Sequence, residues 1–285
     1  MRILVVGAAG QLGHDLLKTL SPGHEVTGVD IGEIDITNAA STGDVVAAGN
    51  PELVINSAAY TNVDGCETET GLAWAVNATG AGNLARACAG AGAPLIHVST
   101  DYVFDGSKGG PYLEDDPTSP LGEYGRSKLA GEEAVREALM NHLIVRTAWL
   151  FGAGGQNFVK TMIRLGKERD ELKVVNDQTG SPTYALHLAE AIRQLAETRL
   201  DRPGIYHMTN SGHCTWFDFA SEIFALAGIE VDLKPTTTAE FTSPAPRPPF
   251  SVLANTRAPE IELPHWRQGL VECLQELGEL KEPST

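Results

Sequence analysis

A tyrosine and a lysine stand four residues apart in Tyr124-Gly125-Arg126-Ser127-Lys128. A helix is predicted over residues 124–139, and residues four apart on a helix share one face. An ammonium group near a phenol favours the phenolate and lowers the phenol's pKa below its usual value of about 10. The pair therefore indicates a tyrosine that acts as an acid or base. The spacing also arises by chance, so a surface pair remains the alternative for this motif taken alone.

Ser99-Thr100-Asp101 follows a predicted apolar strand over residues 95–99. Ligands of doubly wound parallel sheets bind at the carboxyl ends of the strands. We therefore expect Thr100 to hydrogen-bond the same substrate oxygen that Tyr124 protonates.

Glycines at positions 7, 10 and 13 lie between a predicted strand over residues 3–6 and a predicted helix. In that context glycines let the backbone approach a pyrophosphate, which the helix N-terminus attracts. A tight turn is the alternative. Asp30 ends the next predicted strand, where a carboxylate can accept hydrogen bonds from an adenosine ribose. No Lys or Arg lies between residues 19 and 85 to offset a 2′-phosphate, so NADH is favoured over NADPH.

Short apolar segments alternate with helical patterns along the first half of the chain. The predicted strands are 3–6, 25–30, 53–56, 95–99 and 143–146, and the predicted helices between them are 38–49, 66–91 and 124–139. This order predicts an α/β fold with a doubly wound parallel sheet, Rossmann-like, covered on both faces. We expect residues 1–150 to form a dinucleotide-binding domain, rejoined by parts of 170–205. Residues 151–285 would form mainly a smaller α/β substrate lobe, with a proline-rich stretch over 235–250 and a last helix over 264–280.

The composition is that of a globular protein, with 42% apolar and 20% charged residues and a formal net charge of −16. So acidic a chain repels nucleic acid and anionic membrane surfaces, and neither is expected as a partner. The four cysteines lack the spacing of a metal site or a disulfide framework. No segment approaches the ~20 apolar residues of a membrane helix, and the N-terminal apolar run is too short for a signal peptide. We expect a cytoplasmic location.

Longer motifs resemble those of dTDP-4-dehydrorhamnose reductases, in the extended short-chain dehydrogenase/reductase superfamily. The resemblance spans nearly the whole chain. It is carried by the runs over residues 56–64, 99–106, 111–132, 146–151 and 176–183 and by Arg247-Pro248 and Ser251-Val252-Leu253. It implies that an NAD(P)H-dependent enzyme reduces dTDP-4-dehydro-L-rhamnose (dTDP-6-deoxy-L-lyxo-4-hexulose) to dTDP-L-rhamnose.

The resemblance also implies a role for each matched residue. Tyr124 would donate the proton, Lys128 would hold the nicotinamide ribose and lower the phenol's pKa, and Thr100 would assist at the sugar oxygen. The expected cofactor-binding residues are Gly7, Gly10, Gln11, Leu12, Gly13, Asp30, Asp35, Ile36, Ala59, Tyr60, Thr61, Tyr124 and Lys128. The expected substrate-binding residues are Thr100, Asp101, Tyr124, Trp149 and Arg247.

Several points stay open at this stage. Many relatives carry His where this chain has Tyr60. Some relatives dimerise through a Mg²⁺ site that includes an acid after the glycine loop, where Asp15 stands, so a monomer or a homodimer is expected and no metal ligand is assigned. Two alternative functions remain. One is a sugar-nucleotide epimerase or dehydratase of the same superfamily, and the other is a regulatory subunit that binds nucleotide without turnover. Trp216, Phe217 and Phe219 are expected to be core residues.

Overall fold

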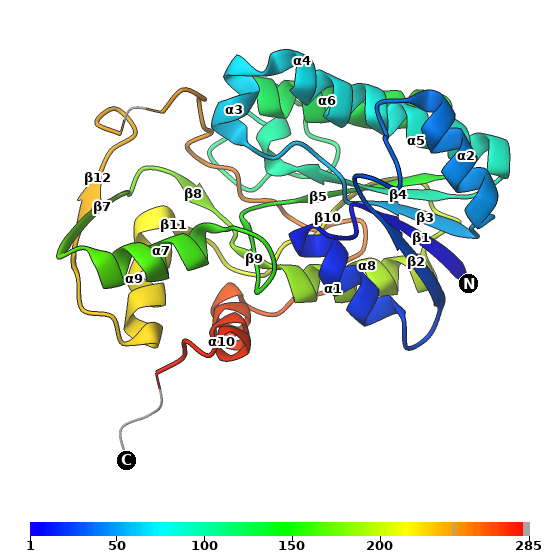
Figure 1. Cartoon of the computed structure of the whole chain (residues 1–285). Helices are drawn as coiled ribbons and strands as arrows, with labels where there is room; N and C mark the ends of the chain where they lie inside the picture. Colours follow the sequence, from blue (N-terminus) through cyan, green and yellow to red (C-terminus); the bar gives the residue numbers. More distant parts are fainter. Residues whose placement is uncertain (242, 282–285) are drawn as a thin grey trace.

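A computed structural model describes residues 1–241 and 243–281 of the chain, and it is built around a six-stranded parallel sheet (Figure 1). The strand order across this sheet is β10-β5-β4-β3-β1-β2. The strands are β1 Arg2–Val6, β2 Glu25–Val29, β3 Leu53–Asn56, β4 Leu95–Thr100, β5 His142–Thr147 and β10 Gly204–His207. From β1 the chain runs to β2 on one side, and from β2 it crosses to β3 on the other side of β1, so the strand order reverses beside β1. In such sheets that point is where ligands bind.

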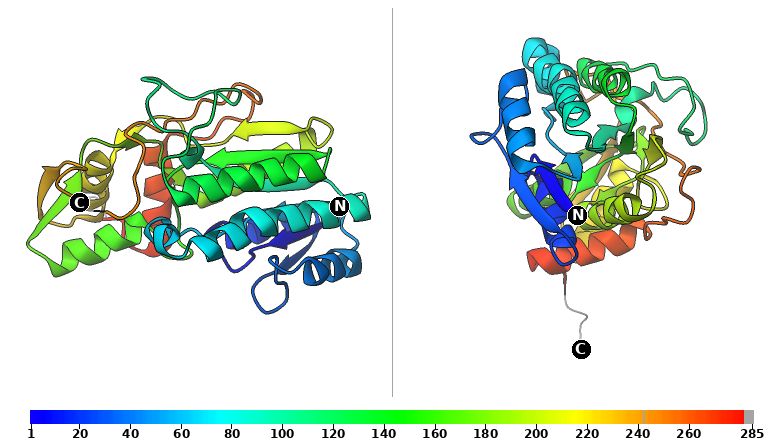
Figure 2. Two further views of the ribbon diagram at one scale, coloured as in Figure 1. Left: turned by 90° about the horizontal axis from the view of Figure 1, so that it is seen from above. Right: turned by 90° about the vertical axis from the view of Figure 1, so that its right-hand side faces the viewer.

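Helices cover both faces of the sheet, as the two further views show (Figure 2). One face packs on α1 Gln11–Leu20 and α8 Ala185–Thr198, and the other on α2 Ala39–Gly49, α5 Ala81–Ala91 and α6 Glu123–Ala138. The continuous apolar run of β1 serves both faces, because Ile3 and Val5 point to the first layer and Leu4 and Val6 to the second. The predicted α/β doubly wound fold is confirmed.

The helix predicted over residues 66–91 is wrong in detail, because the chain is divided there. It forms α3 Val63–Thr68, α4 Thr70–Trp74, a π-helical turn over Ala75–Gly80 and then α5. Glu69 between α3 and α4 leaves helical geometry, with φ −107° and ψ 44°. In the π turn, Asn77 uses its side-chain amide outside the helix, donating to the Tyr60 carbonyl and to Ser127 Oγ. Single π-helical turns of this kind are rare and occur mostly within α-helices.

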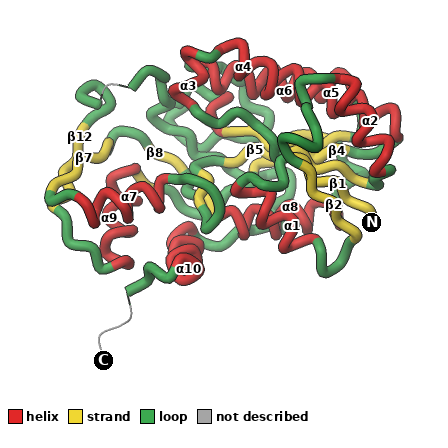
Figure 3. Tube along the Cα trace, viewed as in Figure 1, coloured by secondary structure: helices red, strands yellow, loops and turns green. Residues whose placement is uncertain are grey.

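The second lobe has its own core and less regular structure (Figure 3). Its helices are α7 Phe158–Glu168, α9 Trp216–Ala227 and α10 Trp266–Leu277. Three two-stranded pairs accompany them: β6 Leu150–Phe151 with β9 Thr183–Tyr184, β7 Glu171–Val175 with β12 Asp232–Thr236, and β8 Thr179–Gly180 with β11 Cys214–Thr215. The predicted C-terminal helix is present and lies within the range 264–280.

The chain crosses back from the second lobe after β12. We call residues 243–253 the return segment, drawn in orange in Figure 1, where it passes beside α3. It pairs with the nucleotide lobe through a bridge between Tyr112 and Leu253. Within the described residues, no helix combines the length and the apolar character that crossing a membrane requires.

Candidate active site

A cavity of about 540 Å³ opens at the carboxyl ends of the central strands, between the two lobes. Most of the residues predicted from the sequence to bind cofactor or substrate line it. These are Gly10, Gln11, Leu12, Ala59, Thr61, Thr100, Asp101, Tyr124, Lys128, Trp149 and Arg247. The remaining predicted residues, Gly7, Gly13, Asp30, Asp35, Ile36 and Tyr60, are not in its wall.

Two glycines of the glycine loop, Gly7 and Gly13, lie in close backbone contacts, and the third, Gly10, lines the cavity. Gly7 has φ +83°, and a Cβ there would lie 2.6 Å from the Ala58 nitrogen; a Cβ on Gly13 would lie 2.1 Å from the Gly7 oxygen. Gly10 faces the cavity and precedes α1 without a side-chain cap. The backbone N–H groups that open α1 are therefore left without a side-chain partner beside the cavity, a setting that suits a pyrophosphate.

Asp30 is engaged with the glycine loop itself. Its two carboxylate oxygens accept from the backbone N–H of Ala9 and of Ile31, each at 2.7 Å. This places the carboxylate directly against the loop that would hold the cofactor, with lone pairs left for a ribose hydroxyl. Within the described residues no ion pair reaches Asp30.

Asp35, Ile36 and Tyr60 lie in the loops that surround this region. Asp35 accepts from Thr37, at its backbone nitrogen and at its hydroxyl, and Ile36 is buried against Gly80. The Tyr60 hydroxyl donates to Glu69, so its ring turns toward α3. Nothing in these contacts tests the cofactor roles assigned to the three residues, which stay predictions.

Tyr124 and Lys128 lie on α6, and both face the end of β4. Lys128 is 2% exposed, and its Nζ donates to the Val98 carbonyl at 2.7 Å. Thr100 and Asp101 follow in the chain, where Thr100 Oγ1 donates to Asp101 Oδ1 at 3.1 Å and accepts from the Tyr102 N–H at 3.2 Å. The predicted grouping of Thr100, Tyr124 and Lys128 is thus present in one cavity wall.

Burial governs the proton affinities of this group. It lowers the pKa of Lys128 to about 8, while the neighbouring Glu132 carboxylate opposes the shift. It raises the pKa of Tyr124, although the nearby Thr100 hydroxyl acts in the other direction. Desolvation of the phenolate thus dominates in the protein alone, and the expected lowering of the phenol's pKa by Lys128 stays a prediction. A phenol that keeps its proton suits a proton donor.

Trp149 forms an aromatic wall with a residue that the sequence analysis assigned to the core. Its ring stacks on Trp216 with centroids 3.5 Å apart and planes 5° apart. Its backbone has φ +46°, which is strained for a tryptophan. Gly180 leaves room for the indole, because a Cβ there would lie 2.4 Å from it. Phe219 is a core residue as expected, but Trp216 lines the cavity as well as packing on the core.

Arg247 reaches the cavity from the return segment. Its guanidinium pairs with Asp64 on α3 at 3.1 Å and also donates to the Ala245 carbonyl and to Ser243 Oγ. Asp64 in turn accepts from Ser243 Oγ and from the Ala245 N–H, so one carboxylate holds the start of the return segment against α3. Asp64 was not identified from the sequence, since only the fold brings residues 64 and 247 together.

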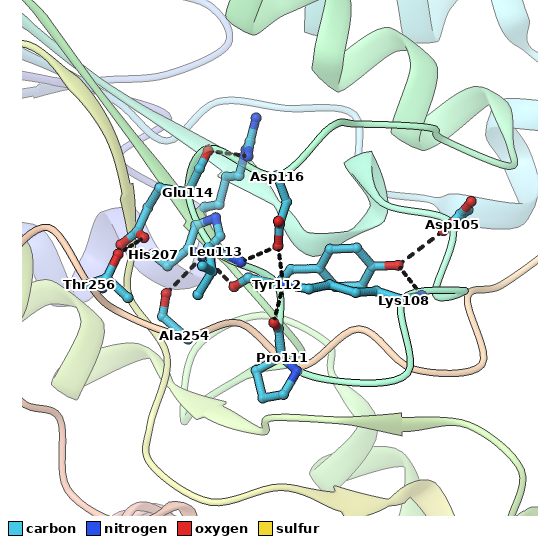
Figure 4. Close-up of polar contacts among 11 residues, drawn as sticks. Asp105, Lys108, Pro111, Tyr112, Leu113, Glu114, Asp116, His207, Ala254 and Thr256 are labelled. Carbon is cyan, nitrogen blue, oxygen red and sulfur yellow. Dashed lines mark hydrogen bonds and ion pairs between the residues drawn. The ribbon is translucent and has the colours of Figure 1, made fainter.

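The long loop between Asp101 and Tyr124 is fixed by buried polar contacts (Figure 4). The Tyr112 hydroxyl donates to Asp105 at 3.0 Å and accepts from the Lys108 N–H at 3.2 Å. Glu114, 2% exposed, accepts from Thr256 at both its nitrogen and its hydroxyl. Such satisfied networks hold a loop in one conformation. The segment that joins the cavity residues Asp101 and Tyr124 is therefore held in place although it is built largely from loop.

No described group of three or more His, Cys, Asp or Glu side chains is arranged to hold a metal ion. Asp15 is buried beside His14, with its Oδ1 3.5 Å from His14 Nδ1. The four cysteines are free and buried.

Comparison with known proteins assigns the family. The RmlD substrate binding domain model matches residues 1–279. A dTDP-4-dehydrorhamnose reductase of Streptomyces griseus is 47% identical over 97% of this chain and 94% of its own. The crystal structure of a dTDP-4-dehydrorhamnose reductase from Clostridium acetobutylicum has a TM-score of 0.94 at 44% identity, covering 98% of this chain and 100% of that one. That of the Bacillus anthracis enzyme in complex with NADP has a TM-score of 0.93 at 43% identity, covering 96% of this chain and 99% of that one.

Proposed function

The chain belongs to the RmlD family of dTDP-4-dehydrorhamnose reductases, and we propose its function, residue by residue, from that premise. The protein is an oxidoreductase that uses a nicotinamide cofactor and reduces dTDP-4-dehydro-L-rhamnose to dTDP-L-rhamnose. Its uncapped α1 N-terminus, the small residues of the glycine loop and the adjoining cavity fit such a cofactor.

The reduced cofactor, when bound, supplies the hydride that the sugar's C4 carbon accepts. Tyr124 donates its proton to the C4 oxygen, so that the carbonyl becomes an alcohol, and the phenol then regains a proton from solvent. The buried position of Tyr124 keeps the phenol protonated until substrate arrives. Lys128 is held by the Val98 carbonyl, and its remaining hydrogens are free to bind the nicotinamide ribose.

The sugar nucleotide would occupy the part of the cavity between Thr100 and the return segment. Thr100 and Asp101 contact the sugar, and Trp149 packs on its ring. Arg247 binds the diphosphate, because a guanidinium fork matches phosphate oxygens. Asp64 already orients that fork toward the cavity and would share it with the ligand.

We assign the cofactor ribose to Asp30 and a preference for NADH over NADPH to its negative charge. The contact between Asp30 and the glycine loop supports this choice, since a 2′-phosphate would approach an uncompensated carboxylate. Gly7, Gly13, Asp35, Ile36, Ala59, Tyr60 and Thr61 complete the proposed cofactor site. For Asp15, the neighbouring His14 favours a hydrogen-bonded acid over a Mg²⁺ ligand.

The division into lobes is proposed on the same basis. Residues 1–150, with α8 and β10 returning to the sheet, bind the cofactor, and the rest of 151–285 binds mainly the sugar nucleotide. A cytoplasmic location and a monomer or homodimer stay predictions.

One observation carries the functional proposal: Thr100, Tyr124 and Lys128 meet Trp149 and Arg247 in a single cavity at the switch point of the sheet. The test is a panel of nucleotide-linked 4-keto sugars that vary in sugar stereochemistry and in base, with the absorbance of NADH or NADPH followed. We expect the highest kcat/KM for dTDP-4-dehydro-L-rhamnose. A higher kcat/KM for another base or sugar would move the assignment to that substrate.

A further inference from the structure

The hydrogen bond between Thr100 and Asp101 raises a problem for the proposed reaction. A threonine hydroxyl has one hydrogen, and here it points to Asp101 Oδ1. An ionised carboxylate would hold that hydrogen firmly, because charge-assisted bonds are the stronger ones. Thr100 would then have no hydrogen left for the sugar oxygen. This part of the reasoning rests on the proposed function.

Asp101 is an unusual carboxyl group. It is 2% exposed, it lines the cavity, and its Oδ2 has no hydrogen-bond partner. No cation pairs with it within the described residues. The groups that face it are the hydroxyls of Thr100 and Ser251, Tyr102 on its own segment and Tyr124 on α6. Arg247 on the return segment lines the same cavity, but it faces Tyr102 and is paired with Asp64. A buried acid in such surroundings favours its neutral form.

The geometry points to Asp101 as a positioning residue that works in its protonated form, donating to Thr100 Oγ1 and so turning the Thr100 hydrogen toward the substrate's C4 oxygen. The Thr100 oxygen has two lone pairs, so it can accept from Asp101 and from the Tyr102 N–H at once. Asp101 keeps its proton throughout. Tyr124 remains the group that transfers one.

The proton affinity of Asp101 agrees with this role. Burial raises its pKa to about 7, although the nearby hydroxyls of Ser251 and Thr100 oppose the shift. The kcat/KM of the reaction should therefore fall as the pH rises through that value. The pKa values of Lys128 and Tyr124 lie above that of Asp101, so the titration of these two groups changes the rate only at higher pH.

The decisive variant is Asp101→Asn, whose amide is a permanent donor to Thr100 and cannot ionise. In the wild type, kcat/KM for the dTDP-linked 4-keto sugar should fall about tenfold per pH unit above the apparent pKa of Asp101. In Asp101→Asn the fall should begin at a higher pH. Thr100→Val removes the hydroxyl that Asp101 orients. The residual kcat/KM of this variant should therefore also lack the fall that begins at the apparent pKa of Asp101. Asp201→Asn, at an exposed aspartate in the loop before β10, should keep the wild-type profile.

A second readout needs neither cofactor nor substrate. A carboxyl whose pKa is raised by folding stabilises the protein at low pH, and this contribution is lost as the pH rises through the folded-state pKa. The melting temperature of the wild type should therefore drop relative to that of Asp101→Asn between about pH 5 and about pH 8. An unchanged difference, or a falling limb at the same pH in both proteins, would overturn the inference. If the wild type reduces no dTDP-linked keto sugar at any pH, the proposed function fails, while the melting curves still report the proton on Asp101.

Discussion

Tyr124 and Lys128 belong to one turn of α6, yet burial moves them in opposite chemical senses. The phenol holds its proton more tightly, and the ammonium holds its proton less tightly, with a pKa of about 8. Each shift disfavours a charged form in the same water-poor wall. This arrangement suits the proposed role of Tyr124, because the phenol keeps the proton that it would donate.

The residue scale offers a direct test of that acid. Tyr124→Phe should lower kcat by about 10²- to 10⁴-fold, the usual effect of losing a positioned proton donor. The dissociation constant of NADH, measured by fluorescence, should change little, because the lost hydroxyl serves the substrate oxygen. Near-wild-type turnover in this variant would show that another group donates the proton.

The proposed role of Asp30 concerns the adenosine end of the cofactor. Asp30→Ala should weaken the binding of NADH and relieve the repulsion of the 2′-phosphate of NADPH. The ratio of the kcat/KM values for the two cofactors should therefore shift toward NADPH by about 1–2 kcal/mol. Because Asp30 also accepts from the Ala9 N–H, Asp30→Asn is the matched control that keeps an acceptor and removes the charge. If neither variant alters the ratio, the carboxylate does not meet the ribose.

At the scale of elements, α6 is placed by close contacts at its glycines. A Cβ on Gly125 would lie 2.2 Å from the Tyr102 carbonyl oxygen, and one on Gly131 would lie 2.2 Å from the Asn77 carbonyl oxygen. A buried ion pair joins the same helix to the sheet, where Glu132 accepts from Arg146 on β5 and from Ser99 on β4. These contacts fix Tyr124 and Lys128 relative to Thr100.

Gly125→Ala should therefore push the start of α6 away from the 3₁₀ turn over Asp101–Val103. We expect a lower melting temperature and a reduced kcat, because both the fold and the Tyr124–Thr100 geometry suffer. Gly43→Ala is the control, since Gly43 lies within α2 with no atom within 4 Å of an added Cβ. That change should be neutral or stabilising by up to about 1 kcal/mol. If the melting temperature and kcat of Gly125→Ala match those of Gly43→Ala, α6 tolerates the added methyl group.

Five of the six strands of the central sheet could be predicted from the sequence, because they are local apolar patterns bounded by glycines and polar residues; β10 was not predicted. The glycine loop, Thr100, Tyr124 and Lys128 followed from the same patterns. What escaped prediction depends on contacts between distant segments. The division of 66–91 arises because Asn77 bonds to Tyr60 and Ser127, and Asp64 matters only because the return segment brings Arg247 to it. The stacking of Trp216 on Trp149 likewise joins distant segments, both packed on the second core.

The whole molecule combines a net charge of −16 with a cavity that must admit a sugar diphosphate. Long-range attraction cannot draw an anion toward such a protein, so local donors have to supply the affinity. Arg247, the residues that open α1 and Lys128 all line the cavity. On the proposed assignment, residues far apart in the sequence would supply the donors of one anion-binding site.

The stoichiometry of a single turnover tests the central claim most directly. A limiting amount of dTDP-4-dehydro-L-rhamnose is mixed with the purified protein and excess NADH, and the loss of reduced nicotinamide and the sugar product are both measured. The account predicts one reduced cofactor consumed for each sugar, dTDP-L-rhamnose as the product, and a protein that arrives largely without bound cofactor. Tightly held NAD in the purified protein, with sugars interconverted and no net consumption of NADH, would contradict it and indicate an epimerase.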